Sequence, residues 1–384
     1  MNRRAFFNLA GAGAASVLAG RARGQAAASS PAARAEAAAP VPAPPESPNP
    51  ASAAPPAATA PPPARMKVGC QRWGSDPARM PLLLRCGVRN ICASPARAGP
   101  DGVWTVETLA DVRRAVESLG MSLDLMYLGV PTAVLSTGDE RDAAIQKVCL
   151  AVRRAGQARI PALQYNLHMR QWKGRTEPVE GRGGSRYAAW DLAKAEDRPA
   201  RPSLAGLQAD EVWARITHFL ERVIPVAAEA RVRMAFHPPD PPVPPDNRWK
   251  VAQVFDTVEG MQRFVQTADS PYHGLVFCQG SFAEMLPRPV PAIYDVIRWF
   301  GSRKKIVSVH FRNLRGGRDR FVETYPDEGD VDMLKAVLAY KECGYAGMLM
   351  PDHVPGHPAD PENLQGFAFA YGYIAGLIQA AYDV

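Results

Sequence analysis

Four side chains that can bind a metal stand at the ends of four short apolar runs. The runs are RMAFH, GLVFC, IVSVH and GMLMPD, and they end in His237, Cys278, His310 and Asp352. These four residues, called the ligand set below, are spaced by 41, 32 and 42 residues, about one strand plus one helix. Side chains at the C-terminal ends of parallel barrel strands converge on one mouth. Two imidazoles, a thiolate and a carboxylate are ligands for a divalent transition metal.

Each member of the ligand set also has a simpler interpretation. A single histidine on a buried strand is usually a hydrogen-bonded core residue. A single cysteine at a strand end usually packs as a small apolar side chain. The joint pattern favours a metal site, because coincidence would have to act at four equivalent positions.

The elements that must position these residues alternate between strand-like and helix-like segments. Eight strands are expected, at residues 67–73, 89–94, 122–127, 161–166, 233–238, 274–279, 305–311 and 347–352. The segments between them have helical periodicity; in TVETLADVRRAVESLG, Thr105 can cap a helix and Gly120 can end it. Strands that alternate with helices predict a parallel sheet, and eight repeats predict closure into a (β/α)8 TIM barrel of the α/β class.

A long polar segment, residues 166–206, follows the fourth expected strand. It is rich in glycine and contains scattered aromatic residues. At the C-terminal face of a barrel, such a loop is a candidate cover for a substrate. The alternative is a surface insertion without function.

The first 65 residues differ in composition from the rest. Residues 1–25 begin with the twin arginine Arg3 and Arg4 and a weakly apolar stretch, which resembles a twin-arginine export signal and implies a periplasmic protein. The stretch is too short and glycine-rich for a transmembrane span. Residues 26–65 are rich in alanine and proline and are expected to form a disordered linker. The catalytic domain is expected at residues 66–384.

Charge and cysteine content exclude some classes of protein. The net charge is +7, but the first 65 residues hold six arginines and two glutamates, which leaves +3 for the rest. No run of Lys or Arg interleaves with aromatics, which argues against a nucleic-acid partner. The six cysteines form no CxxC pair and suggest no disulfide framework.

The motifs from His237 onward resemble those of the mannonate dehydratase family, which belongs to the xylose-isomerase-like TIM barrels. HPPDPP, FCQGS, VHFRN, EGDVDM and PDH occur in that family's order and spacing, and CQRWG and QYN are similar as well. The resemblance covers most of residues 66–384. It implies that the ligand set holds Mn²⁺ (or Fe²⁺) and that the protein removes water from D-mannonate, giving 2-keto-3-deoxy-D-gluconate.

The resemblance also implies roles for residues beside the metal. His353, directly after Asp352, matches the family's catalytic histidine. Arg312 and Asn313 are candidates for binding the substrate carboxylate or hydroxyls; a salt bridge and a turn cap at the barrel rim are equally good alternatives. Asn166, in QYN, is a further candidate for substrate binding.

The chain departs from the family pattern around the proton-transfer groups. MPDHVPGH carries Met350 and Pro355 where the family has arginines, and PENLQGFAFAYGY has no clear counterpart of the family's Tyr-rich segment. Tyr325 is the candidate replacement for a family histidine that precedes EGDVDM. The expected function is a hydro-lyase acting on a small-molecule sugar acid. A sugar isomerase or epimerase and a non-catalytic sugar-acid-binding homologue remain open alternatives. The protein is also a candidate homo-oligomer.

Overall fold

The computed structural model describes residues 64–74, 76–94, 97–169, 174–196, 200–243 and 252–383. The chain divides into two units, Met1–Pro61 and Pro62–Val384. The expected signal and nearly all of the expected linker lie outside the described residues, so both stay predictions.

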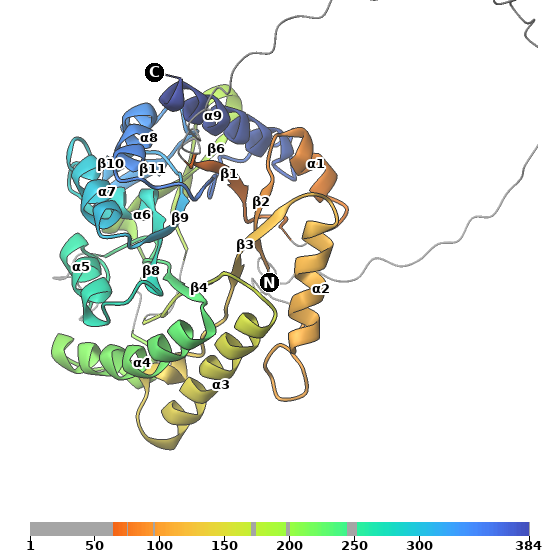
Figure 1. Ribbon diagram of the computed structural model, residues 1–384. Helices are drawn as coiled ribbons and strands as arrows, with labels where there is room; N and C mark the ends of the chain where they lie inside the picture. The colour runs from red at the N-terminus through yellow and green to blue at the C-terminus, as the bar shows by residue number, and fades with distance from the viewer. Residues whose placement is uncertain are drawn as a thin grey trace, which may run out of the picture. The chain divides into compact units, whose positions relative to one another are not determined.

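Eight parallel strands close into a barrel (Figure 1). In order around the ring they are β1 (Lys67–Cys70), β2 (Asn90–Ala93), β3 (Ser122–Tyr127), β4 (Ala162–Tyr165), β7 (Arg233–Phe236), β8 (His273–Cys278), β9 (Ile306–His310) and β12 (Met348–Met350). The pairs Lys67↔Met348 and Val68↔Leu349 join β1 to β12 and close the ring. All eight expected strands are present, and the TIM-barrel prediction is confirmed.

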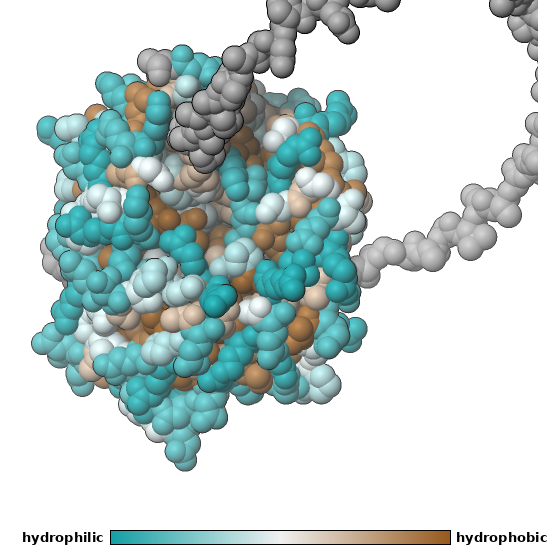
Figure 2. All heavy atoms as spheres, viewed as in Figure 1, coloured by the Kyte–Doolittle hydropathy of each residue, from teal (hydrophilic) through white to brown (hydrophobic). Residues whose placement is uncertain are grey.

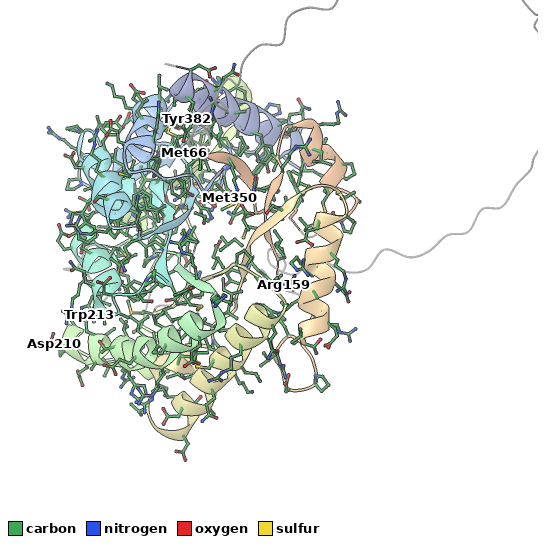
Figure 3. All side chains as sticks on the ribbon, in the orientation of Figure 1. Met66, Arg159, Asp210, Trp213, Met350 and Tyr382 are labelled. Atoms are coloured by element: carbon green, nitrogen blue, oxygen red, sulfur yellow. The ribbon has the colours of Figure 1, made fainter. Side chains whose placement is uncertain are left out.

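Alternation along the strands separates the inside of the barrel from its outside. The inner cluster consists of Cys92, Leu125, Ala162, Ala235, Val276, Met348 and Met350. Figure 3 labels Met350 within the ring of strands. In β7, Ala235 belongs to this cluster, whereas its neighbours Met234 and Phe236 belong to the larger cluster between strands and helices. Neighbouring residues point to opposite faces because the side-chain period of a strand is two.

Helices surround the strands (Figure 1). They are α1 (Met80–Arg85), α2 (Val106–Glu117), α3 (Gly138–Gln157), α4 (Ala209–Ala230), α5 (Val258–Thr267), α6 (Gln279–Met285), α7 (Ala292–Ser302), α8 (Met333–Glu342) and α9 (Leu364–Tyr382). Short 3-10 turns lie at η2 (Thr132–Leu135), η3 (Arg182–Gly184), η4 (Leu192–Lys194) and η5 (Pro202–Leu204). The buried residues of α4, among them Val212, Ile216, Phe219 and Val223, recur at helical spacing.

The start of α2 follows the sequence pattern more closely than its end does. Thr105 Oγ1 accepts a hydrogen bond from Thr108 N at 3.2 Å, as expected for an N-cap. The helix ends at Glu117, three residues before Gly120. Gly120 has a φ of +69° and turns the chain toward β3.

A second sheet, called the accessory sheet below, was not expected from the sequence. Its antiparallel strands lie in the order β10 (Leu314–Gly317), β11 (Arg320–Glu323), β6 (Arg186–Asp191) and β5 (Thr176–Glu180). Two insertions build it: β5 and β6 follow β4, and β10 and β11 follow β9. The polar segment expected as a loop therefore contains two strands. Neither insertion predicts the sheet by itself, because β6 and β11 pair across a long stretch of chain.

The surface is mostly polar in the orientation of Figure 2, with smaller apolar patches between polar side chains. Among the described residues, no helix combines the length and apolar character needed to cross a membrane.

Candidate metal centre

The ligand set converges at the C-terminal ends of four neighbouring strands. Cys278 and His310 end β8 and β9 and are paired across the two strands. His237 directly follows β7, and Asp352 lies two residues beyond β12. One ligand atom from each residue lies within 4.8 Å of the other three. The convergence expected from the strand spacing is therefore present, and ion binding by this set is a proposal.

Hydrogen bonds determine which nitrogen His237 turns toward the centre. His237 Nδ1 lies 2.7 Å from Pro238 O and must donate its proton to that carbonyl, which leaves Nε2 bare. Burial lowers the pKa of His237, so the ring stays neutral and keeps a lone pair. His237 Nε2 lies 3.1 Å from His310 Nδ1. Two nitrogens that are each about 2.1 Å from one ion would be about 3 Å apart, so this spacing fits a shared metal.

The sulfur ligand has a polar environment. Cys278 Sγ accepts a hydrogen bond from Ser281 N at 3.4 Å and lies 3.7 Å from Asp352 Oδ2. Within the described part of the chain, His310 Nε2 is buried without a hydrogen-bond partner. Two nitrogens, one sulfur and one carboxylate oxygen make a donor set that fits a first-row divalent ion.

Asp352 is held from the neighbouring strand β1 by a residue that was not selected from the sequence. Gln71, just after β1, donates through Nε2 to Asp352 Oδ1 at 2.9 Å. Burial raises the pKa of Asp352, but the positive charges of His353, His310 and Arg312 hold it well below its usual value. The carboxyl is therefore ionised and oriented for a cation. Gln71 lies in the motif CQRWG, so that motif could have identified it as a candidate site residue from the sequence.

Five ionisable residues, called the charged cluster below, lie beside the ligand set; Glu284, Arg312 and Glu323 are buried, and Arg175 and Asp240 are mostly buried. Arg312 Nη1 lies 2.9 Å from Asp240 Oδ2, and Nη2 lies 2.8 Å from Glu284 Oε1. Arg175 donates through Nε to Glu323 Oε1 at 2.9 Å and also contacts Asp240 through Nη2. Buried charges of this kind persist only when they are paired.

Arg312 makes ion pairs within the charged cluster, and substrate binding by Arg312 stays a prediction. Its side chain is fully buried, and Nη1 lies 3.3 Å from Asp352 Oδ2 as well as close to Asp240. These contacts match the salt-bridge alternative. Arg312 connects the charged cluster to the ligand set rather than reaching out of the barrel.

Asn313 matches the turn-cap alternative. Its Nδ2 donates to Pro326 O and Val331 O, each at 2.9 Å. Its Oδ1 accepts from Leu314 N at 2.9 Å and Val331 N at 3.2 Å. Both donors and both acceptor positions of the amide are thus used inside the protein. The prediction of a substrate-binding Asn313 finds no support in these contacts.

His353 lies beside the ligand set and faces Glu323. Its Nδ1 is 2.9 and 3.1 Å from the two oxygens of Glu323, and its Nε2 is 3.7 Å from Asp352 Oδ1. Partial burial lowers the pKa of His353, but the charges of Asp352 and Glu323 raise it to about 9. The side chain is 48% exposed, so a reactant can reach it.

Tyr325 and Asn166 have their described contacts outside the ligand set. Tyr325 OH lies 3.0 Å from Ser185 Oγ, and its ring packs edge-on against Tyr187 at 5.9 Å. Tyr325 therefore packs against the β5–β6 arm of the accessory sheet. Asn166 Oδ1 accepts from Tyr127 OH at 3.2 Å at the end of β4.

Most of the charged cluster was missed from the sequence. Asp240 lies inside HPPDPP, and that motif was an available signal. Arg175 and Glu323 lie in the two insertions that build the accessory sheet, where nothing local distinguishes them from surface charges. Glu284 lies on α6, three residues after FCQGS, and nothing in the sequence distinguishes it from an acidic residue on the surface of a helix.

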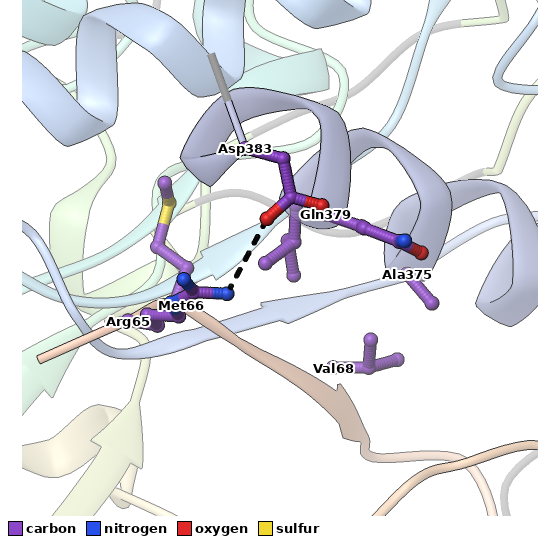
Figure 4. Close-up of a pocket in the computed structure, with 7 residues that line it drawn as sticks. Arg65, Met66, Val68, Ala375, Gln379 and Asp383 are labelled. Carbon is purple, nitrogen blue, oxygen red and sulfur yellow. Dashed lines mark ion pairs between the residues drawn. The ribbon is translucent and has the colours of Figure 1, made fainter.

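An open hollow lies at the other end of the barrel (Figure 4). Its lining includes Met66 and Val68 around the start of β1 and Ala375 and Gln379 near the end of α9. Because β1 runs from this end toward Cys70, the hollow and the ligand set lie at opposite ends of the strands.

In sequence, the chain is similar to mannonate dehydratases. The D-mannonate dehydratase (UxuA) family model matches residues 203–382, a stretch that contains the whole ligand set and His353. The chain is 28% identical over 329 residues to the mannonate dehydratase of Thermotoga petrophila, covering 72% of this chain and 86% of that protein. It is 26% identical over 365 residues to the Enterococcus faecalis mannonate dehydratase, covering 82% and 98%.

Solved structures agree on the fold. The crystal structure of mannonate dehydratase from Streptococcus suis serotype 2 matches with a TM-score of 0.71 at 24% identity, covering 83% of this chain and 94% of that one. A xylose isomerase domain protein from Planctomyces limnophilus matches with a TM-score of 0.54 at 13% identity, covering 84% and 100%. The chain is thus similar in sequence to mannonate dehydratases, and it has the barrel fold found in one of them.

Proposed function

We propose that this protein is a metal-dependent hydro-lyase of the mannonate dehydratase type. It would remove water from D-mannonate, or from a related sugar acid, to give a 2-keto-3-deoxy sugar acid. The observation that carries the proposal is the ligand set, four donor atoms within 4.8 Å of one another at the mouth of a barrel. The similarity in sequence to mannonate dehydratases, at 28% and 26% identity, supports the same reaction.

The reaction needs positive charge at the substrate carboxylate. The proton on C2, next to the carboxylate, is hardly acidic, and its removal produces a doubly charged enediolate. A divalent ion, proposed to be Mn²⁺ or Fe²⁺ and held by the ligand set, would supply the charge that stabilises this species. Gln71 would orient the Asp352 carboxylate through its hydrogen bond, and the charge of Arg312 helps to keep that carboxylate ionised.

The elimination of water also needs two proton transfers, and the enol that it leaves becomes the keto acid by gaining a proton on C3 and losing the proton of its C2 hydroxyl. A base takes the C2 proton, and an acid protonates the C3 hydroxyl, which leaves as water. His353 is our candidate for one of them, because it is half exposed and its Nε2 lies 3.7 Å from Asp352. Tyr325 is our candidate for the other; it comes from the segment that follows β11, and its hydroxyl lies 3.0 Å from Ser185 Oγ.

Product analysis tests the proposal. Purified protein loaded with Mn²⁺ is incubated with D-mannonate, other aldonates and a panel of ketoses. Formation of a 2-keto-3-deoxy acid is expected, and Cys278→Ser should lose both bound metal and turnover while keeping its circular dichroism spectrum. Exchange between ketose and aldose, or between epimers, would establish an isomerase or epimerase instead. Tight binding of a sugar acid without turnover would establish a non-catalytic homologue.

We also propose that the twin arginine directs export to the periplasm. Replacing Arg3 and Arg4 by lysine should retain the protein in the cytoplasm, as measured by fractionation of cells that carry a twin-arginine export pathway. Unchanged export of this variant would show that the arginine pair is incidental.

A further inference from the structure

The accessory sheet delivers a carboxylate to the candidate catalytic histidine. Glu323 is the last residue of β11, and its side chain is 2% exposed. Its two oxygens lie 2.9 and 3.1 Å from His353 Nδ1. His353 belongs to the eighth barrel strand's loop, whereas Glu323 belongs to an insertion after the seventh. The contact therefore exists only because the accessory sheet folds against the barrel mouth.

Positive charges hold Glu323 in this place. Arg175 Nε donates to Glu323 Oε1 at 2.9 Å, and Arg312 Nη1 lies 3.3 Å from the same oxygen. Burial raises the pKa of Glu323, but Arg175, His353 and Arg312 lower it to about 2. At neutral pH, Glu323 is therefore an ionised carboxylate that can only accept hydrogen bonds.

Arg312 competes with Glu323 for the same nitrogen of His353. Arg312 Nη1 lies 2.5 Å from His353 Nδ1, and this nitrogen cannot both accept from Arg312 and donate to Glu323. Arg312 has other acceptors, Asp240 at 2.9 Å and Glu284 at 2.8 Å. An ionised Glu323 has no proton to give, so its two close contacts require a proton on Nδ1. Donation from His353 to Glu323 is the arrangement that satisfies both groups.

We propose that Glu323 is the positioning residue for His353. It keeps a proton on Nδ1 and fixes the ring, so that Nε2 is the nitrogen that exchanges a proton with the substrate. A buried carboxylate that receives Nδ1–H fixes a catalytic imidazole in the same way in serine hydrolases. The expected effect on turnover rests on the proposed function. The proposal makes the accessory sheet part of the active site.

The alternative is that Glu323 only neutralises Arg175 and Arg312. A double-mutant cycle separates the two roles, because a residue that acts through His353 has nothing to act on once His353 is gone. Alone, Glu323→Gln should lower kcat about 10-fold or more with little change in KM, and His353→Asn should lower kcat roughly 10² to 10⁴-fold. In the His353→Asn background, adding Glu323→Gln should cost less than about 2-fold. Equal losses in both backgrounds would overturn the proposal.

The matched control is Glu180→Gln. Glu180 ends β5 in the same sheet and is exposed, so this variant should keep wild-type turnover. Thermal unfolding and bound metal are measured for every variant. A Glu323→Gln protein that unfolds before assay is replaced by Glu323→Asp, which keeps the charge and should recover part of the lost kcat.

A second measurement needs no substrate. In metal-free protein labelled with ¹⁵N-histidine, His353 should show a proton on Nδ1 that exchanges slowly with water; the signal is assigned by its loss in His353→Asn. Glu323→Gln should remove this slow exchange. A bare Nδ1 in the wild-type protein would mean that it accepts from Arg312, and would overturn the proposal. If the signal is present but no sugar acid is turned over, the proposed function fails while the positioning of His353 stands.

Discussion

Two histidines near the barrel mouth differ in what their rings contact. His310 is buried, and its Nδ1 lies 3.1 Å from His237 Nε2 and 3.5 Å from Asp352 Oδ2. His353 is half exposed, and its Nδ1 is turned to Glu323. The first environment suits a metal ligand, and the second suits a group that exchanges protons with a reactant.

Substitution should therefore separate metal binding from turnover. His353→Asn should keep its bound Mn²⁺ while turnover falls roughly 10² to 10⁴-fold, because only a proton-transfer group is removed. His310→Asn should lose metal and turnover together. Metal content is measured by elemental analysis of the dialysed proteins. A His353→Asn protein that loses metal as His310→Asn does would make His353 a ligand, or an essential support of one.

Gln71 is expected to matter through Asp352 alone. Gln71→Ala removes the hydrogen bond to Asp352 Oδ1, so the affinity for Mn²⁺ should fall about 10 to 100-fold, and excess Mn²⁺ should restore turnover. Gln379→Ala, in the hollow at the other end of the barrel, is the matched control and should bind Mn²⁺ like the wild type. A turnover defect in Gln71→Ala that excess metal does not repair would assign Gln71 a direct part in the chemistry.

At the scale of elements, not every threonine at the start of a helix caps that helix. Thr105 and Thr137 precede α2 and α3 with the same extended backbone. Only Thr105 accepts a hydrogen bond from its own helix, at 3.2 Å from Thr108 N. The two threonines form a natural pair for comparison.

Thr105→Ala should lower the free energy of unfolding by about 1 kcal/mol, because it leaves a backbone N–H of the first turn without its acceptor. Thr137→Ala should cost clearly less. Urea unfolding followed by circular dichroism measures both variants. Equal losses would mean that the side chain of Thr137 also caps its helix in solution.

At the scale of the whole barrel domain, the charged cluster ties the accessory sheet to the loops of the barrel. Arg175 directly precedes β5, and Glu323 ends β11. Asp240 lies in the loop after β7, and Arg312 lies in the loop after β9. Breaking one buried ion pair leaves its partner charged and unpaired. The domain should therefore respond to pH through this cluster.

The acid side of the stability profile tests this response. The pKa of Glu323 is lowered from 4.5 to about 2, so between these values the unfolded chain binds a proton that the folded chain does not. The stability that this group contributes is complete above pH 4.5 and is lost as the pH falls toward 2. Glu323→Gln should therefore lose less stability than wild type between roughly pH 5 and pH 3, in urea unfolding of the metal-free protein. Glu180→Gln serves as the control, and a Glu323→Gln profile parallel to wild type would contradict the prediction.

The barrel and the ligand set could be predicted from residue order alone. Each strand is a local apolar run, and the spacing of His237, Cys278, His310 and Asp352 repeats with the strand–helix unit. Closure of a parallel barrel then brings every strand end to the same mouth, whatever the details of packing. The convergence follows from topology, and topology is visible in local patterns.

The surroundings of the ligand set depended on contacts between distant segments. The partners of Arg312 and Asn313 are Asp240, Glu284, Pro326 and Val331, none of which is their immediate neighbour in sequence. Glu323 reaches His353 only because the pairing of β6 with β11 orders both insertions at once. Hydrogen bonds and ion pairs of buried side chains are set by which segments meet in space, and a one-dimensional pattern carries no record of such meetings.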